Sequence, residues 1–133
     1  MIKLNFTQIV MIGAEGLWGE DARTTFPWDK PVKWDMETFE LYKSLISLRK
    51  SNAALIDGGL RWVHISEDLI VYLRETKTEK LLVAVSRNSV DNVEIDLKRA
   101  GISSAEQLLG GANLSGEGML SIAGAGLGIW SVK

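Results

Sequence analysis

Five carboxylate side chains in the first part of the chain could do acid–base chemistry. They are Glu15, Glu20, Asp21, Asp29 and Asp35. A glycosidase needs two carboxyl groups placed across the bond that it cleaves. None of these residues lies at the end of an expected strand or in an apolar stretch, where burial would raise a carboxyl pKa. We therefore expect solvated carboxylates and one helix cap, and we predict no catalytic residue in this chain.

Other reactive residue types are scarce. The sequence has no Cys and one His, so composition leaves neither thiolate chemistry nor a His-rich metal site. His64 alternates with Val63 and Ile65, which predicts a strand residue that points outward. The segment Gly124-Ala-Gly-Leu-Gly128 is similar to a phosphate loop, but the residues after it predict a strand and not the helix whose N-terminus would bind phosphate. We predict no cofactor and no metal.

Five tryptophans could stack on the apolar faces of sugars. Trp62 and Trp130 lie within expected strands, where a place in the core is favoured. Trp18, Trp28 and Trp34 lie in an irregular stretch rich in glycine and proline. At those three positions, ligand contact and packing both stay open.

Length and charge restrict the class of protein. The chain has 133 residues, 46% of them hydrophobic and 24% charged, which is typical of one globular domain or one domain with an appendage. The net charge is −2 and there is no basic block, so nucleic acid is not an expected partner. No apolar run approaches the roughly 18 residues that span a membrane, and we expect a cytoplasmic protein without membrane contact.

One helix is expected after the irregular residues 1–34. It covers residues 35–52, with Asp35 as the N-cap. Apolar residues between Phe39 and Leu48 cover roughly half of its circumference, whereas a surface helix needs a stripe of only about 100°. We therefore predict a homo-oligomer that buries Phe39, Tyr42, Leu45 and Ile46 of this apolar face.

The rest of the chain predicts strands. The clearest are Leu60 to Ile65, Leu69 to Glu75, Lys80 to Ser86 and Val93 to Leu97. The third is almost entirely apolar and is expected to be central. Residues 76–79 and 88–92 are expected to be hairpin connections. Weaker strands are expected at 107–109, 119–122 and 127–132, and the spacing of all seven favours an antiparallel sandwich or barrel.

Five short stretches occur in an informative order. They are Gly16-Leu-Trp-Gly-Glu-Asp-Ala-Arg23, Phe26-Pro-Trp-Asp29, Phe39-Glu-Leu-Tyr-Lys-Ser-Leu-Ile-Ser-Leu-Arg-Lys50, Asn52-Ala-Ala-Leu55 and Gly58-Gly59. This order resembles the C-terminal part of the alpha-amylase family (glycoside hydrolase family thirteen), most closely its alpha-glucosidase, neopullulanase and cyclomaltodextrinase branch. The resemblance covers about residues 12–133.

The resemblance implies a fold. In that family the last barrel helix is followed by a β-sandwich called domain C. Residues 1–56 would then be the end of a (β/α)8 barrel, its loop and last helix, and residues 57–133 the C-terminal β-sandwich domain. The expected fold class is mainly β: an antiparallel Greek-key β-sandwich of the domain C type, preceded by an N-terminal loop and one α-helix.

The resemblance also implies a function. The family's catalytic Asp, Glu and second Asp belong to barrel segments upstream of this sequence, so we expect a truncated piece that is inactive by itself. It would be the accessory, structural C-terminal domain of a glycoside hydrolase acting on alpha-glucosidic linkages. A carbohydrate-binding module, or an oligomerising truncated gene product without a catalytic role, stays open. Because the loop borders the active-site cleft in the family, Arg23 and Trp28 are the candidates for contact with an alpha-glucan or maltooligosaccharide.

Overall fold

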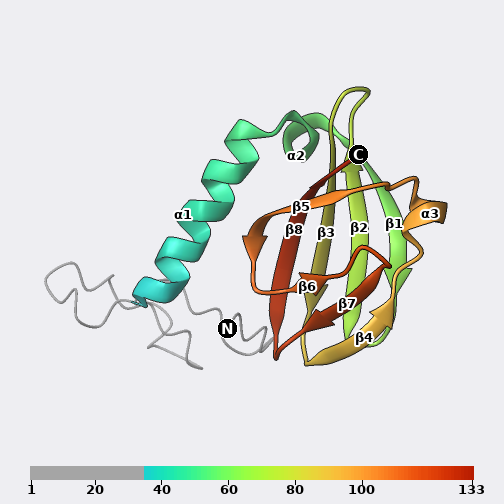
Figure 1. Cartoon of the computed structure of the whole chain (residues 1–133). Helices are drawn as coiled ribbons and strands as arrows, with labels where there is room; N and C mark the ends of the chain where they lie inside the picture. Colours follow the sequence, from blue (N-terminus) through green and yellow to red (C-terminus); the bar gives the residue numbers. More distant parts are fainter. Residues whose placement is uncertain (1–34) are drawn as a thin grey trace, which may run out of the picture. The chain divides into compact units, whose positions relative to one another are not determined.

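The computed structural model describes residues 35–133. Residues 35–48 belong to one compact unit and residues 49–133 to a second. The elements, drawn in Figure 1, are α1 (Met36–Ser51), α2 (Ala53–Asp57), β1 (Gly59–Ile65), β2 (Leu69–Glu75), β3 (Lys80–Ser86), β4 (Val90–Glu94), α3 (Leu97–Ala100), β5 (Ala105–Gly110), β6 (Asn113–Leu114), β7 (Met119–Ile122) and β8 (Gly126–Val132). The expected irregular loop over residues 1–34 lies outside the described residues, and the predicted division at residue 56 stays a prediction.

Helix α1 begins where the sequence predicts. The Asp35 carboxylate accepts the backbone N–H of Thr38 at 3.0 Å and the Thr38 hydroxyl at 2.6 Å. This contact satisfies one of the free N–H groups at the start of the helix. Arg49 and Lys50 lie in the last turn, at the negative end of the helix dipole. The predicted helix and its cap are confirmed.

The sandwich consists of two antiparallel sheets (Figure 1). One has five strands in the order β1-β2-β3-β8-β5, and the other has three in the order β4-β7-β6. Strand β3 is central, as its apolar sequence predicts. Neighbours such as β3 and β8 are far apart along the chain, which is typical of Greek-key connections. The predicted fold class is confirmed, although the two short helices α2 and α3 were not expected.

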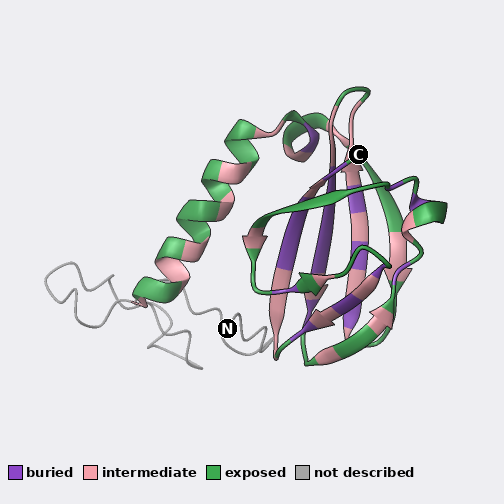
Figure 2. Cartoon of the chain, in the orientation of Figure 1, coloured by how far each residue is buried: buried purple, intermediate pink, exposed green. Residues whose placement is uncertain are grey.

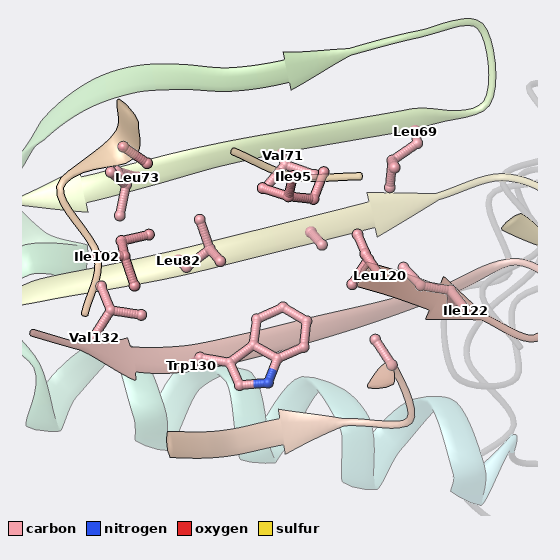
Figure 3. Close-up of a cluster of buried hydrophobic side chains, with 13 residues drawn as sticks. Leu69, Val71, Leu73, Leu82, Ile95, Ile102, Leu120, Ile122, Trp130 and Val132 are labelled. Atoms are coloured by element: carbon pink, nitrogen blue, oxygen red, sulfur yellow. The ribbon is translucent and has the colours of Figure 1, made fainter. Parts of the chain in front are cut away.

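The core fills the space between the two sheets (Figure 3). Alternate residues of β2 and β3 face it, including Leu69, Val71, Leu73 and Leu82. Trp130 of β8 lies in the same cluster and is 3% exposed, so its predicted place in the core is confirmed. Figure 2 shows that the longest buried stretches belong to β3 and β8.

The connection after β3 is not a hairpin, contrary to the prediction for residues 88–92. Strand β3 already pairs with β2 on one edge and β8 on the other, so β4 joins the second sheet and pairs with β7. The predicted strand from Val93 to Leu97 is also wrong at its end. Strand β4 stops at Glu94, and the Asp96 carboxylate accepts the Arg99 N–H at 2.8 Å as the cap of α3.

Two expectations for β1 are wrong. Trp62 is 52% exposed, because it lies on an edge strand and pairs with Tyr72 on the face that points away from the core. The register shifts between Trp62 and His64, which is a β-bulge at Val63. Val63 packs against the core, and His64 is half-buried instead of pointing outward. The His64 Nε2 is buried and has no hydrogen-bond partner among the described residues.

Candidate functional site

The residues predicted to contact sugar, Arg23 and Trp28, lie outside the described residues. So do Trp18, Trp34 and four of the five candidate carboxylates. Asp35 is the described one, and it caps α1. The hydrogen bonds from Thr38 lower the pKa of Asp35, so this carboxyl group stays ionised, whereas a general acid needs a raised pKa.

Glu75 and Asp68 of the sandwich are held in ion pairs with arginine side chains. The Glu75 carboxylate accepts the Arg61 Nε–H at 2.8 Å, and the Asp68 carboxylate accepts the Arg87 Nε–H at 2.6 Å. These hydrogen bonds lower the pKa of Glu75 and of Asp68. Both pairs tie neighbouring strands together, and neither presents a protonated carboxyl group to a ligand.

A hollow of about 380 Å³ lies beside the edge strand β1. Arg61 and Trp62 of β1 line it together with Asp96, Arg99 and Ala100. The Arg61 Nη2 donates to the Ala100 carbonyl at 2.9 Å, so one guanidinium connects β1, β2 and α3. The Trp62 ring meets Tyr72 edge-on, with 5.7 Å between ring centroids. The arrangement fastens α3 to the edge of the sheet.

A second hollow, of about 410 Å³, is lined by polar uncharged groups from both sheets. These are the side chains of Asn92, Gln107, Asn113, Ser115 and Ser121, with Trp130 among the apolar ones. None of the described residues that line it is charged. Sequence reasoning missed this hollow because its residues come from separate strands. A signal was present at Asn92, since asparagine is one of the few residues that tolerate a positive φ, and φ is 49° here.

The described residues contain neither a candidate metal site nor a candidate membrane-spanning helix. Residues 35–133 contain no group of three or more His, Asp and Glu side chains that could hold a metal ion. None of their helices is long and apolar enough to cross a membrane. The cytoplasmic location stays a prediction.

One curated protein gives a sequence match, and no family model matches the chain. Alpha-amylase 2 of Dictyoglomus thermophilum is 37% identical over 76 residues, which are 57% of this chain and 13% of that protein. The chain thus spans a small part of its relative.

Solved structures match over more of the chain. The native debranching enzyme of Nostoc punctiforme covers 90% of this chain with 26% of its own, at 22% identity and a TM-score of 0.72, and supports the fold. A mutant of the trehalulose synthase MutB covers 71% of this chain with 18% of its own, at 27% identity and a TM-score of 0.59. In its sequence and in its fold, this chain is similar to the C-terminal part of alpha-amylase family glycosidases.

Proposed function

We propose that this chain is the accessory, structural C-terminal domain of a glycoside hydrolase that acts on alpha-glucosidic linkages, and that it hydrolyses nothing by itself. The observation that supports this most is the extent of the match, because the 76 matching residues are 13% of alpha-amylase 2. In barrel enzymes the catalytic residues lie at the carboxyl ends of barrel strands. The described strands form a sandwich instead.

A sheet that is apolar on both faces supports the proposed structural role. Leu82 and Ala84 of β3 face the core, whereas Leu81 and Val83 alternate with them and face away, yet all four are at most 5% exposed. An antiparallel sheet with one wet face would carry polar residues there. A sheet of this composition is suited to packing between two bodies.

Helix α2 already covers one end of the outward face. The Arg74 Nε donates to the Ala54 carbonyl at 3.2 Å, and the Ala54 N–H donates to the Glu79 carboxylate at 2.6 Å. Ala54 itself is fully buried against β2 and β3. These bonds fasten the segment before β1 to the sandwich.

The second candidate is a carbohydrate-binding module. Arg23 and Trp28 remain the proposed sugar contacts of the first loop, and the uncharged hollow of the sandwich is the described feature that favours sugar binding.

Hydrolysis by the purified chain is the first test. We expect no release of glucose from maltose and no release of the aryl group from an aryl alpha-glucoside above the buffer rate. Turnover that disappears in Asp29→Asn or Glu20→Gln would contradict the proposal, because it would place a catalytic carboxylate in this chain.

A deletion in the relative tests the accessory role directly. Removing the 76 matching residues from alpha-amylase 2 is expected to lower its unfolding temperature, because an apolar face of the remaining enzyme would lose its cover. A truncated enzyme with unchanged unfolding temperature and activity would rule out the stabilising role.

A further inference from the structure

The uncharged hollow lies where the two sheets meet at one side of the sandwich. Gln107 comes from β5 of the larger sheet, whereas Asn113 and Ser121 come from β6 and β7 of the smaller one. Asn113 and Ser121 are paired across these two strands. Its volume of about 410 Å³ lies in the range of about 300 to 1,000 Å³ that is usual for small-ligand pockets.

The side chains of this hollow have the chemistry of a site for neutral hydroxyl groups. An amide offers both donors and acceptors, and a serine hydroxyl offers one donor and two acceptor lone pairs. No lysine, arginine or carboxylate is among the described residues that line the hollow. A phosphate, a metal ion or an anionic ligand would lack a counter-charge here, whereas the hydroxyl groups of a neutral ligand would meet uncharged donors and acceptors.

Part of the hollow is held in place by the fold. The Gln107 Nε2 donates to the carbonyls of Gly110 at 3.0 Å and Ala112 at 2.8 Å, which leaves its side-chain oxygen as an acceptor. The Asn92 N–H donates to the Ser121 Oγ at 3.1 Å, and the Ser121 hydroxyl donates to Asp91 at 3.1 Å. These bonds fix two of the polar groups before any ligand arrives, which lowers the entropy cost of binding.

Two amide groups have no partner in the fold. The side-chain amides of Asn92 and Asn113 form no hydrogen bond to another described residue, and both residues are exposed. Asn92 has a φ of 49°, a conformation in which most side chains are strained. The backbone thus holds an unpaired amide at the hollow, which Trp130 of the core cluster also lines.

From this arrangement we propose that the hollow between β5, β6 and β7 binds a neutral sugar, and that the sugar is a segment of an alpha-linked glucan. The class of site rests on the uncharged donors and acceptors. The choice of the alpha linkage rests on the proposed function. The ligand would be held by Asn92, Asn113 and the Gln107 oxygen.

The test is a titration of the full ¹⁵N-labelled chain with maltotetraose, followed through the side-chain NH₂ signals of Asn92, Gln107 and Asn113. We expect saturable shifts of these signals with a Kd of about 1 mM, because the hollow is shallow and open. The double variant Asn92→Gly with Asn113→Ala should weaken binding about tenfold, since two hydrogen bonds are lost. Glycine keeps the positive φ at position 92 available.

The matched control is Asn88→Ala. The Asn88 amide is exposed outside the hollow and donates to Asp68 at 2.9 Å, so its removal should leave the maltotetraose titration unchanged. The indole N–H signal of Trp130, which should keep its position in each variant, reports that the core is intact.

Two outcomes would overturn the site: no shift of the three amide signals, or equal binding by the double variant and the wild type. A titration with cellotetraose, which is beta-linked, tests the sugar site separately from the proposed function. Equal binding of cellotetraose and maltotetraose would keep the sugar site and remove the alpha-glucan assignment. Absence of any binding would leave the accessory role in a glycoside hydrolase untouched.

Discussion

The contact between Gly128 and Trp130 shows how one missing side chain shapes the core. A Cβ at position 128 would lie 2.2 Å from the Trp130 Cη2 and 2.6 Å from the Ala112 Cβ. The indole therefore occupies the space that any other residue would need. Because Trp130 is 3% exposed and packs in the core cluster, moving the indole would disturb its packed neighbours.

We predict that Gly128→Ala destabilises the protein by about 2 kcal/mol, the usual cost of overpacking a filled core. The measurement is urea unfolding followed by tryptophan fluorescence. Gly59→Ala is the matched control in another strand, since its Cβ would meet only the Glu75 carbonyl at 3.8 Å. An unfolding midpoint for Gly128→Ala equal to that of the control would contradict the prediction, because it would show that the Trp130 ring can shift to make room for the added methyl group.

The ion pair of Glu75 and Arg61 predicts a pH dependence. The pKa of Glu75 lies below its ordinary value of 4.5, mainly because Arg61 donates a hydrogen bond to the carboxylate. A carboxyl group whose pKa is lower in the folded state stabilises the fold above its unfolded pKa, and this stabilisation disappears as the pH falls through the folded pKa. Arg61 is 43% exposed, so solvent screens the pair and the effect is small.

We expect Glu75→Gln to lose less stability than the wild type between about pH 6 and about pH 3, because the variant has no charge to lose. The free energy of unfolding at each pH is the measurement. Glu117→Gln, at an exposed position in the turn before β7, should follow the wild-type curve. If the free energy of unfolding changed with pH in the same way for all three proteins, the ion pair of Glu75 and Arg61 would not contribute to stability as predicted.

At the scale of elements, the apolar face of α1 leads to the prediction of a homo-oligomer. Tyr42 and Ile46 are 55% and 52% exposed, whereas Phe39 and Leu45 are half-buried. No residue of α1 is fully buried (Figure 2). The exposed part of this face is therefore available to a second copy of the chain.

Sedimentation velocity at tens of micromolar should detect a homodimer of the wild type. The double variant Tyr42→Lys with Ile46→Lys should sediment as a monomer, because two charges cannot be buried in an apolar contact. Ser44→Lys, on the opposite side of the helix, should stay dimeric. A wild type that sediments as a single monomeric species would reject the association.

Short elements were the ones that sequence patterns predicted least well. Val93, Ile95 and Leu97 alternate as in a strand and all three pack in or against the core, but β4 ends at Glu94 and α3 begins at Leu97. Asp96 and Gly101, the cap residues of α3, were the available signal: Gly101 has a φ of 73° and its N–H bonds the Lys98 carbonyl at 3.0 Å. A four-residue helix is too short to show a periodicity of its own.

The bulge in β1 could not be predicted from local pattern. Strict alternation would place the side chains of Val63 and His64 on opposite faces of the sheet. The extra residue of the bulge interrupts this alternation, so the face of each side chain can no longer be read from the local pattern. The exposure of Trp62 depends on the position of β1 at the edge of the sheet. That position is decided by how all the strands pair, and the local sequence of β1 does not show it.

For the whole molecule, the sequence predicted the two-sheet sandwich better than it predicted the order of the strands within each sheet. The apolar run of β3 indicated a central strand, and the order of motifs indicated the resemblance to the alpha-amylase family. The pairing of β3 with β8, and the passage of β4 to the other sheet, depend on contacts between distant segments. The amide-lined hollow depends on that same order, so it became visible only in the folded chain.

The place of β8 in the larger sheet has a consequence during synthesis on the ribosome. Strand β8 lies between β3 and β5, so the apolar β3 keeps one open edge, and β5 has no partner in this sheet, until residues 126–132 have been translated. An apolar strand with an unpaired edge is a template for aggregation. The nascent polypeptide is thus most exposed to aggregation through β3 before this late segment pairs with it.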